Sequence, residues 1–214
     1  MIHVFYTTFL ERLPAAIWNY WYNMLTPAMQ LQISKYRHWQ DAQRSLLGKA
    51  LLLSGCRKLN LREISLQDLV VNSYQKPYFP AGPAFNISHS GALVVCAVSS
   101  TNIIGIDVEE IKPIPLADFS DLFSEEELQT IFKNEDDFSP FYNLWTQKEA
   151  FVKAIGTGLH LPLRQVEVDK GQIRYNNDCW YIQQLNISSG YSCNVATDGI
   201  GVEILIDEIL FNDV

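Results

Sequence analysis

The chain is most informative in the stretch Trp145-Thr-Gln-Lys-Glu149-Ala-Phe-Val-Lys153. On a helix, Trp145, Glu149 and Lys153 follow one another at intervals of four residues and therefore share one face. A carboxylate on that face can accept a proton or bind a metal ion, and an ammonium group can contact a phosphate. Taken alone, the stretch favours a simpler interpretation, a surface Glu–Lys pair beside a core tryptophan. That interpretation weakens because a second acidic stretch lies about 40 residues upstream.

The second stretch is Gly105-Ile-Asp107-Val-Glu109, which we expect to lie in a strand. Residues i and i+2 of a strand point to the same side, so Asp107 and Glu109 project together. Ile106 and Val108 then face the opposite layer. Two carboxylates on one side of an apolar strand repel each other and are costly to bury, and a hard divalent cation, Mg²⁺ or Mn²⁺, would resolve that conflict. The alternative is a strand end at which both carboxylates are hydrated, and the Asp-x-Glu pattern alone favours it.

The composition is that of a globular, acidic protein. Its 214 residues are 48% hydrophobic, enough for a real core in one large domain or two small ones. The net charge of −8 and a pI near 4.9 argue against nucleic-acid binding. Residues 31–62 nevertheless hold seven Lys or Arg side chains and one acid, which indicates a local anion site. Residues 118–137 hold eight acids and one Lys, which indicates a solvated helix face.

The cysteines and the hydrophobic runs indicate the compartment. The four cysteines are too widely spaced for a metal site or a redox pair, and we expect reduced core thiols at Cys56, Cys96, Cys179 and Cys193. The first residues have neither the basic flank nor the apolar stretch of a signal peptide. No apolar run approaches the roughly 18 residues that a membrane-spanning helix needs. We therefore expect a cytoplasmic protein without a membrane segment.

Periodicity and turn residues predict the order of elements. The expected helices cover residues 12–25, 27–57, 115–133 and 138–155. Pro27 and Gly55 mark the ends of the second helix, and Ser124 with Glu127 forms a capping-box pattern in the third. The expected strands cover residues 3–8, 92–98 and 103–109, with mixed loop and strand over 66–87 and short β-rich runs over 163–210.

An internal echo predicts a duplicated architecture. Phe85-Asn-Ile-Ser88 recurs about 100 residues later as Leu185-Asn-Ile-Ser188, and a glycine and a second apolar strand follow each copy. We predict an α+β fold of two similar halves, residues 1–103 and 104–214, with the boundary near residues 100–104. A cleft between two such halves is the expected place for an active site.

Four motifs in order resemble those of the surfactin-synthetase-activating (Sfp-type) 4′-phosphopantetheinyl transferase family. They are Lys76-Pro77, Phe85-Asn-Ile-Ser-His-Ser90, Gly105-Ile-Asp-Val-Glu109 and Trp145-Thr-Gln-Lys-Glu-Ala-Phe-Val-Lys153. The resemblance extends from about Tyr36 to Pro162 and implies a monomer of two similar α+β halves with coenzyme A and Mg²⁺ between them. It also implies transfer of phosphopantetheine from coenzyme A to a serine of an acyl or peptidyl carrier protein, with release of adenosine 3′,5′-bisphosphate.

The resemblance also implies roles for single residues. Asp107, Glu109 and Glu149 would hold Mg²⁺ on the pyrophosphate of coenzyme A. Glu149 would also be the base for the serine hydroxyl, while Lys153 would stabilise the charge that develops on the pyrophosphate. The resemblance implies that His89 and Asp107 contact the pyrophosphate of coenzyme A, and that Lys76 contacts the nucleotide or its phosphates. Arg44 and Ser45 would contact the 3′-phosphate and adenine side. Asn86 and Ser88 would shape the loop that contacts coenzyme A.

One segment departs from the family pattern. Relatives often carry lysines ahead of the Arg44 position, where this chain has Met29-Gln-Leu-Gln32. The 3′-phosphate would then be held more loosely, or by Lys35 or Arg37. For Trp145 we expect a packing role that fixes the helix of Glu149.

Two alternatives come from other functional classes. A Mg²⁺-dependent nucleotide-pyrophosphate hydrolase would also suit an Asp-x-Glu pair with a distant Glu, but nothing in the chain resembles the glutamate-rich helix usual in such enzymes. A non-catalytic module that binds coenzyme A or a carrier protein would have no need of Asp107, Glu149 or Lys153, and all three are present. Incubation of the protein with coenzyme A, Mg²⁺ and an apo carrier domain, followed by measurement of the carrier's mass, separates the three functions.

Overall fold

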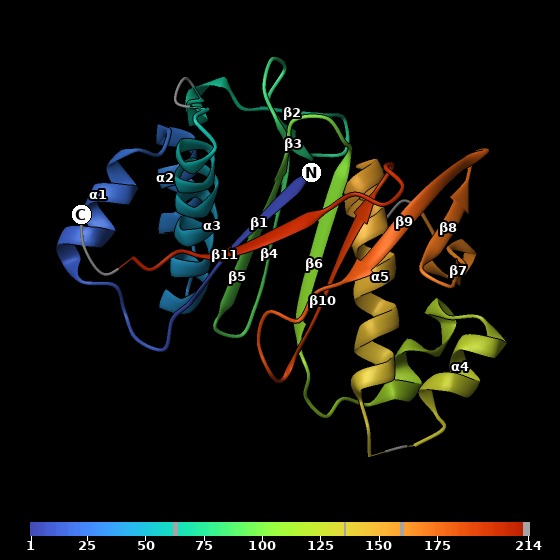
Figure 1. Ribbon diagram of the computed structural model, residues 1–214. Coiled ribbons are helices and arrows are strands. Elements are labelled where there is room, and N and C mark those ends of the chain that lie inside the picture. The colour runs from blue at the N-terminus through green and yellow to red at the C-terminus, as the bar shows by residue number, and fades with distance from the viewer. Residues whose placement is uncertain (62–63, 135, 159–160, 212–214) are drawn as a thin grey trace.

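The computed structural model describes residues 1–61, 64–134, 136–158 and 161–211 (Figure 1). Its helices are α1 (Ala15–Asn23), α2 (Pro27–Ser34), α3 (Trp39–Lys58), α4 (Glu125–Ile131) and α5 (Ser139–Ile155). Its strands are β1 (Ile2–Thr8), β2 (Val70–Val71), β3 (Pro77–Tyr78), β4 (Ala84–Ser90), β5 (Leu93–Ser99), β6 (Ile104–Glu110), β7 (Val168–Asp169), β8 (Gln172–Tyr175), β9 (Asp178–Gln184), β10 (Tyr191–Thr197) and β11 (Ile204–Glu208). Of the helices in the described ranges, none has the length and hydropathy needed to cross a membrane.

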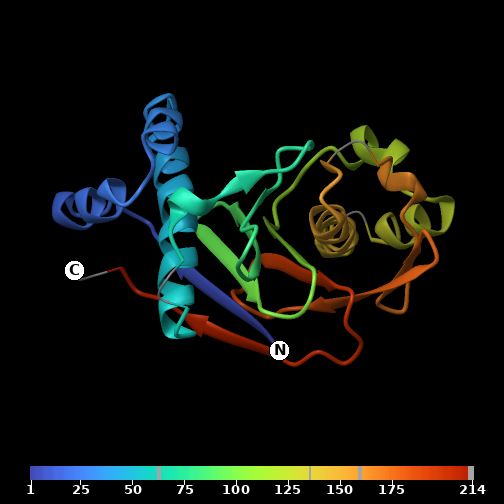
Figure 2. The ribbon, with the colours of Figure 1, turned by 90° about the horizontal axis from the view of Figure 1, so that it is seen from above.

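The strands form two larger sheets and a small β2–β3 hairpin. The first sheet has the order β11-β1-β5-β4, and the second has the order β6-β10-β9-β8-β7. Both sheets contain the same three-stranded arrangement. In the first sheet, β5 pairs antiparallel with β4 and with β1. In the second sheet, β10 pairs antiparallel with β9 and with β6. The helices α3 and α5 lie on the outer sides, with the sheets between them (Figure 2). The predicted α+β fold of two similar halves is therefore confirmed.

The last strand returns to the first half of the chain. β11 runs parallel to β1 at the edge of the first sheet, with Ile204 opposite Ile2 (Figure 1). The boundary near residues 100–104 stays a prediction. A division at that point leaves β11, from the second segment, paired with a strand of the first.

The two sheets bury an apolar layer between them. Ile106 and Val108 of β6 lie in this layer together with residues of β1, β5 and β10. Asp107 and Glu109 alternate with them and point to the other side of the sheet, toward α5. The predicted alternation of β6 is therefore confirmed, and it sends two carboxylates toward a helix instead of toward water.

Gly105 allows α5 to lie directly against β6. A Cβ atom at this position would overlap two backbone atoms of α5, the carbonyl oxygen of Ala150 and the nitrogen of Ala154. Only glycine therefore permits this contact. The contact holds the helix face that carries Glu149 and Lys153 close to the strand.

Two predicted helices differ from the structure. The helix expected over residues 27–57 is two helices, because residues 35–38 lie outside both of them and His38 is extended (φ −101°, ψ 134°). α2 buries only Ile33, whereas α3 buries a full side against the first sheet, and the break lets each helix take its own direction. The helix expected over 115–133 is a 3-10 segment (Leu116–Leu122) followed by α4, whose capping box is confirmed.

Two smaller expectations have mixed outcomes. Cys56, Cys96 and Cys193 are free and buried, as predicted for core thiols, whereas the free Cys179 is only partly buried. The echoed tetrapeptides are not structurally equivalent, because residues 85–88 lie in β4 whereas residues 185–188 follow β9. The similarity of the halves therefore depends on their topology.

Gly105→Ala should destabilise the fold by roughly 1–3 kcal/mol or more, because the added methyl group meets backbone atoms that cannot move without displacing α5. Gly48→Ala in α3 is the matched control, since its methyl group meets only side chains, with Ile87 nearest. Alanine also gains about 1 kcal/mol over glycine inside a helix. Urea unfolding measures both variants. Equal losses in the two would contradict a rigid contact at Gly105.

Candidate active site

Side chains of β4 supply acceptors to the free edge of β6. Three backbone N–H groups donate to these side chains: Ile106 to Asn86 Oδ1 (2.9 Å), Val108 to Ser88 Oγ (3.3 Å) and Glu110 to Ser90 Oγ (3.1 Å). Buried amides need such acceptors, and alternate residues of β4 present them in a row. We call this row of hydrogen bonds the β4–β6 seam. Asn86 and Ser88, predicted to shape a loop that contacts coenzyme A, lie within strand β4.

The carboxylate of Asp107 is buried beside the seam. Its residue is 3% exposed, and its Oδ1 accepts hydrogen bonds from Ser88 Oγ (2.9 Å) and Lys153 Nζ (2.5 Å). Lys153 also donates to Ser88 Oγ (3.0 Å). Glu109 accepts a hydrogen bond from Ser90 Oγ (2.7 Å). The alternative of two hydrated carboxylates at a strand end is therefore wrong for Asp107.

The helix α5 brings Glu149 and Lys153 to this group. The two residues are one turn apart, and both interact electrostatically with Asp107. One turn earlier, the Trp145 ring packs against Phe119 and Phe141, with ring centroids 5.9 and 6.0 Å away. The packing role predicted for Trp145 is confirmed. We call the three carboxylates Asp107, Glu109 and Glu149, together with Lys153 that pairs with Asp107, the acidic cluster.

The acidic cluster contains more negative charge than its surroundings neutralise. Burial raises the pKa of Glu149, and the charge of Asp107 raises it further, whereas Lys153 lowers it. Burial also raises the pKa of Glu109, against the lowering effect of its hydrogen bond from Ser90. Asp107 Oδ2 and Glu149 Oε1 are buried and accept no hydrogen bond within the described part of the chain.

These donors fit a hard divalent cation. Such a cation prefers carboxylate oxygens and would neutralise their repulsion, and the two oxygens without hydrogen-bond donors are available to it. Among the residues that the structure describes, however, no three His, Cys, Asp or Glu side chains are already arranged to hold a metal ion. Asp107, Glu109 and Glu149 would have to draw together around the cation, and their role as ligands stays a prediction.

The opposite side of β4 carries a cationic group. His89 alternates with Ser88 along the strand and so points away from the seam, toward α3. Desolvation by the surrounding protein lowers the pKa of His89, and the positive charges of Arg44, Lys153 and Lys49 lower it further. Cations that converge on an exposed imidazole create a site suited to an anion such as phosphate. We call the cations Arg44 and Lys49, together with the imidazole of His89, the cationic group.

Local hydrogen bonds orient the cations of α3. Arg44 Nη1 donates to the carbonyl oxygen of Gly91 (2.6 Å), and the guanidinium also pairs with Asp41. Lys49 Nζ donates to Ser45 Oγ (2.9 Å), and burial lowers the pKa of Lys49. Lys49 is missing from the predicted site. Its spacing of four residues from Ser45 is the signal that could have included it.

The side chain of Lys76 is directed at the end of α5. Its Nζ donates to the carbonyl oxygen of Ala154 (2.8 Å) and lies 3.5 Å from that of Ile104. Burial lowers the pKa of Lys76 to about 8. Because carbonyl groups of the protein already engage this ammonium group, its contact with a nucleotide stays a prediction.

Lys148, which is not among the predicted site residues, supports the site from the far side of α5. The residue is fully buried, and its Nζ donates to Glu127 Oε2 (2.7 Å) and to the carbonyl oxygen of Leu163 (3.0 Å). Glu127 also accepts a hydrogen bond from the Ser124 backbone in the capping box (2.8 Å). Glu127 therefore departs from the solvated face expected for residues 118–137, and its pair with Lys148 joins α4 to α5.

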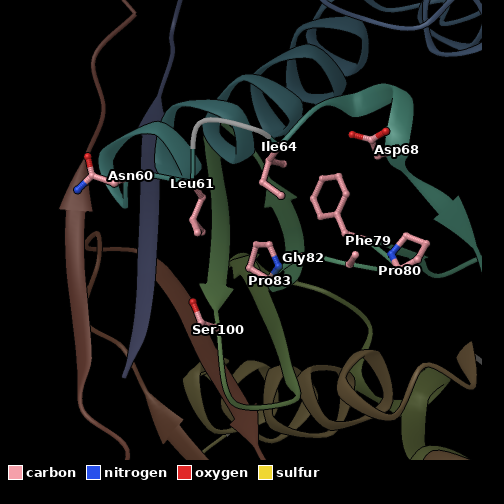
Figure 3. A pocket seen from close by; sticks show the side chains of 10 residues that line it. Asn60, Leu61, Ile64, Asp68, Phe79, Pro80, Gly82, Pro83 and Ser100 are labelled. Atoms are coloured by element: carbon pink, nitrogen blue, oxygen red, sulfur yellow. The ribbon is translucent and has the colours of Figure 1, made fainter.

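An open pocket in the first half is separate from these residues (Figure 3). Its walls come from the chain after α3 and from the segment before β4, and include Leu61, Ile64, Phe79 and Pro83. The described residues that line it include no member of the acidic cluster or of the cationic group. The pocket is therefore separate from the candidate site at the β4–β6 seam.

Comparison with known proteins gives consistent matches in both halves. Residues 103–196 match the family model described as 4′-phosphopantetheinyl transferase superfamily, and residues 14–101 match the one described as 4′-phosphopantetheinyl transferase, N-terminal. The chain is 34% identical over 185 residues to the 4′-phosphopantetheinyl transferase Sfp of Bacillus subtilis, covering 81% of this chain and 82% of that protein. It is 32% identical over 179 residues to the 4′-phosphopantetheinyl transferase gsp of Aneurinibacillus migulanus, covering 80% and 73%.

Glu149→Gln should raise the thermal midpoint of unfolding at neutral pH without divalent cations, because it removes a charge that burial and Asp107 disfavour. A raised carboxyl pKa means that the folded state binds the proton more tightly than the unfolded state, so wild-type stability falls as pH rises through that pKa. The gain should therefore shrink at acidic pH, where the wild-type carboxyl is protonated.

Calorimetry over a pH series checks this, with Glu203→Gln as the control at an exposed carboxylate. A lower thermal midpoint of Glu149→Gln at neutral pH would contradict this account, because it would show that the fold stabilises the charged Glu149 carboxylate.

Proposed function

The chain belongs to the 4′-phosphopantetheinyl transferase superfamily, and from this we propose that it transfers phosphopantetheine from coenzyme A to a serine of an acyl or peptidyl carrier protein, with Mg²⁺ and with release of adenosine 3′,5′-bisphosphate. One observation supports this reaction best. The acidic cluster and the cationic group lie on the two sides of one strand, where Ser88 and His89 are neighbours, and two carboxylate oxygens of the acidic cluster have no hydrogen-bond donor among the described residues. Phosphoryl transfer depends on such charge neutralisation and alignment.

The cationic group is the proposed site for the phosphates of coenzyme A. His89 is exposed at the end of β4, and the charge of Lys153 in the acidic cluster acts on it from the other side of the strand, so it can contact the pyrophosphate. Arg44 and Ser45 lie on α3 on the side proposed for the 3′-phosphate and adenine. Lys35 and Arg37 are exposed between α2 and α3, from where either can supplement this contact.

Asp107, Glu109 and Glu149 are the residues that would hold Mg²⁺ or Mn²⁺. When bound, the ion supplies positive charge that neutralises the pyrophosphate leaving group. Asp107 is already fixed by Ser88 and Lys153, whereas Glu149 Oε1 has no hydrogen-bond donor in the described structure. Glu149 is therefore the carboxylate with most freedom to change partners.

Glu149 is the proposed general base. A buried carboxylate with a raised pKa holds a proton more readily than a solvated one, which suits a group that must take the proton of a serine hydroxyl. The serine oxygen then bonds to the phosphorus atom that carries the pantetheine, and the bond from that phosphorus to the bridging oxygen breaks. Adenosine 3′,5′-bisphosphate leaves with the electron pair, and Lys153 stabilises the charge that develops.

We further propose that the enzyme works as a monomer in the cytoplasm, in keeping with its free cysteines. The nucleotide-pyrophosphate hydrolase and the non-catalytic binding module remain the alternatives. A hydrolase would consume coenzyme A without a carrier protein, and a binding module would consume none.

Incubation of the protein with coenzyme A, Mg²⁺ and an apo carrier protein should raise the mass of the carrier by about 340 Da, the transferred phosphopantetheine. Glu149→Gln should lower the single-turnover rate on the order of 10²-fold or more, the range for general-base catalysis, while coenzyme A still binds. Mass spectrometry of the carrier and calorimetric titration of coenzyme A give the two quantities. An unchanged carrier mass in the wild-type reaction would contradict the proposed function.

A further inference from the structure

The turn over residues 72–76 joins β2 to β3 in the first half and is fixed by its own hydrogen bonds. Asn72 Oδ1 accepts hydrogen bonds from the backbone N–H groups of Tyr74 and Lys76, both at 2.9 Å. The backbone N–H of Asn72 donates to the carbonyl oxygen of Lys76 (3.0 Å). Gln75 between them is left-handed (φ 66°). The turn therefore presents the side chains of Asn72 and Lys76 in fixed directions.

Both side chains donate hydrogen bonds to the C-terminal end of α5 in the second half. Asn72 Nδ2 donates to the carbonyl oxygen of Gly156 (3.1 Å), and Lys76 Nζ donates to that of Ala154 (2.8 Å). The last carbonyl groups of a helix have no partners within the helix and carry partial negative charge. An amide N–H and an ammonium group are suitable donors for this end. The turn of the first half thus caps the helix that carries Glu149 and Lys153.

The same ammonium group also approaches β6. Lys76 Nζ lies 3.5 Å from the carbonyl oxygen of Ile104, the first residue of that strand. The next residue is Gly105, where α5 and β6 touch. A Cβ atom at Gly156 would lie 2.8 Å from Cδ of Lys76, so the lysine side chain passes close to the end of the helix. Lys76 therefore occupies the junction of the helix, the strand and the first half.

We infer that the 72–76 turn holds α5 against β6 from the first half of the chain, and that Lys76 is a positioning residue for the transfer reaction. Lys153 directly precedes Ala154, and Glu149 lies little more than one turn before it, so displacement of this helix end moves both away from Asp107. Misplacement of reacting groups by about 1 Å can reduce a rate on the order of 10²-fold. The kinetic consequence rests on the proposed function.

A direct contact between Lys76 and the nucleotide of coenzyme A is the competing role, and the two roles differ in what they change. A nucleotide contact contributes to coenzyme A binding, so its loss raises the dissociation constant. A positioning residue acts through α5, so its loss lowers the rate of the bound complex. Asn72 separates the roles further, because it shares the cap of α5 and carries no charge for a phosphate.

The experiment compares Lys76→Met, Lys76→Arg and Asn72→Ala with Lys133→Met, a control at an exposed lysine. Single-turnover carrier modification gives the rate, and calorimetric titration gives the dissociation constant of coenzyme A. Lys76→Met and Asn72→Ala should lower the rate on the order of 10-fold or more with coenzyme A affinity within about 2-fold of wild type. Lys76→Arg, which keeps a cation and its donors, should retain most of the rate, and Lys133→Met should match wild type.

Hydrogen exchange of the amides of residues 150–156 provides a readout that does not depend on activity. It should accelerate in Lys76→Met and Asn72→Ala and stay at the wild-type rate in Lys133→Met. Weaker coenzyme A binding in Lys76→Met, with Asn72→Ala unaffected, would overturn the inference in favour of a nucleotide contact. Unchanged exchange in both variants would also overturn it. If the wild-type protein modifies no carrier, the proposed function fails, and the exchange rates alone decide the role of the turn.

Discussion

The β4–β6 seam is the interaction on which the rest of the site depends. One edge of β6 pairs with β10, and the amides on its other edge would be left without acceptors if β4 did not offer side-chain oxygens. Ser88 accepts from the backbone of Val108 and from Lys153, and it donates to Asp107. The same serine therefore joins the two halves and orients the acidic cluster. Any change in how the halves meet must also change the cluster.

The site combines burial with unbalanced charge, which lowers stability and suits phosphoryl transfer. Among the described residues, Asp107 has hydrogen-bond donors on one oxygen only, and the pKa values of Glu109 and Glu149 are raised because their charges are partly removed from water. His89 follows Ser88 on β4 and faces the opposite side of the strand, where the charges of Arg44 and Lys49 of α3 act on it. Strand alternation places the acidic cluster and the cationic group on opposite sides of β4, so their charges do not neutralise one another fully. Charge therefore remains available for a ligand.

The local parts of the site could be predicted from sequence, whereas the long-range contacts could not. The alternation of residues 103–109 and the four-residue spacing in α5 follow from strand and helix geometry, and the structure has both. The partners of Lys76, Lys148 and Ser88 lie in distant segments, and no local pattern states which polar groups meet. The return of β11 to β1 is likewise set by pairing across nearly the whole chain. The break between α2 and α3 depends on which side each helix buries.

Amide hydrogen exchange at the β4–β6 seam tests the central claim most directly. In the wild-type protein the amides of Ile106, Val108 and Glu110 should exchange slowly, because each donates to a side chain of β4. In Ser88→Ala the amide of Val108 alone should lose protection, since its acceptor is the one removed. Rapid exchange of all three amides in the wild-type protein, or unchanged protection of Val108 in Ser88→Ala, would contradict the account.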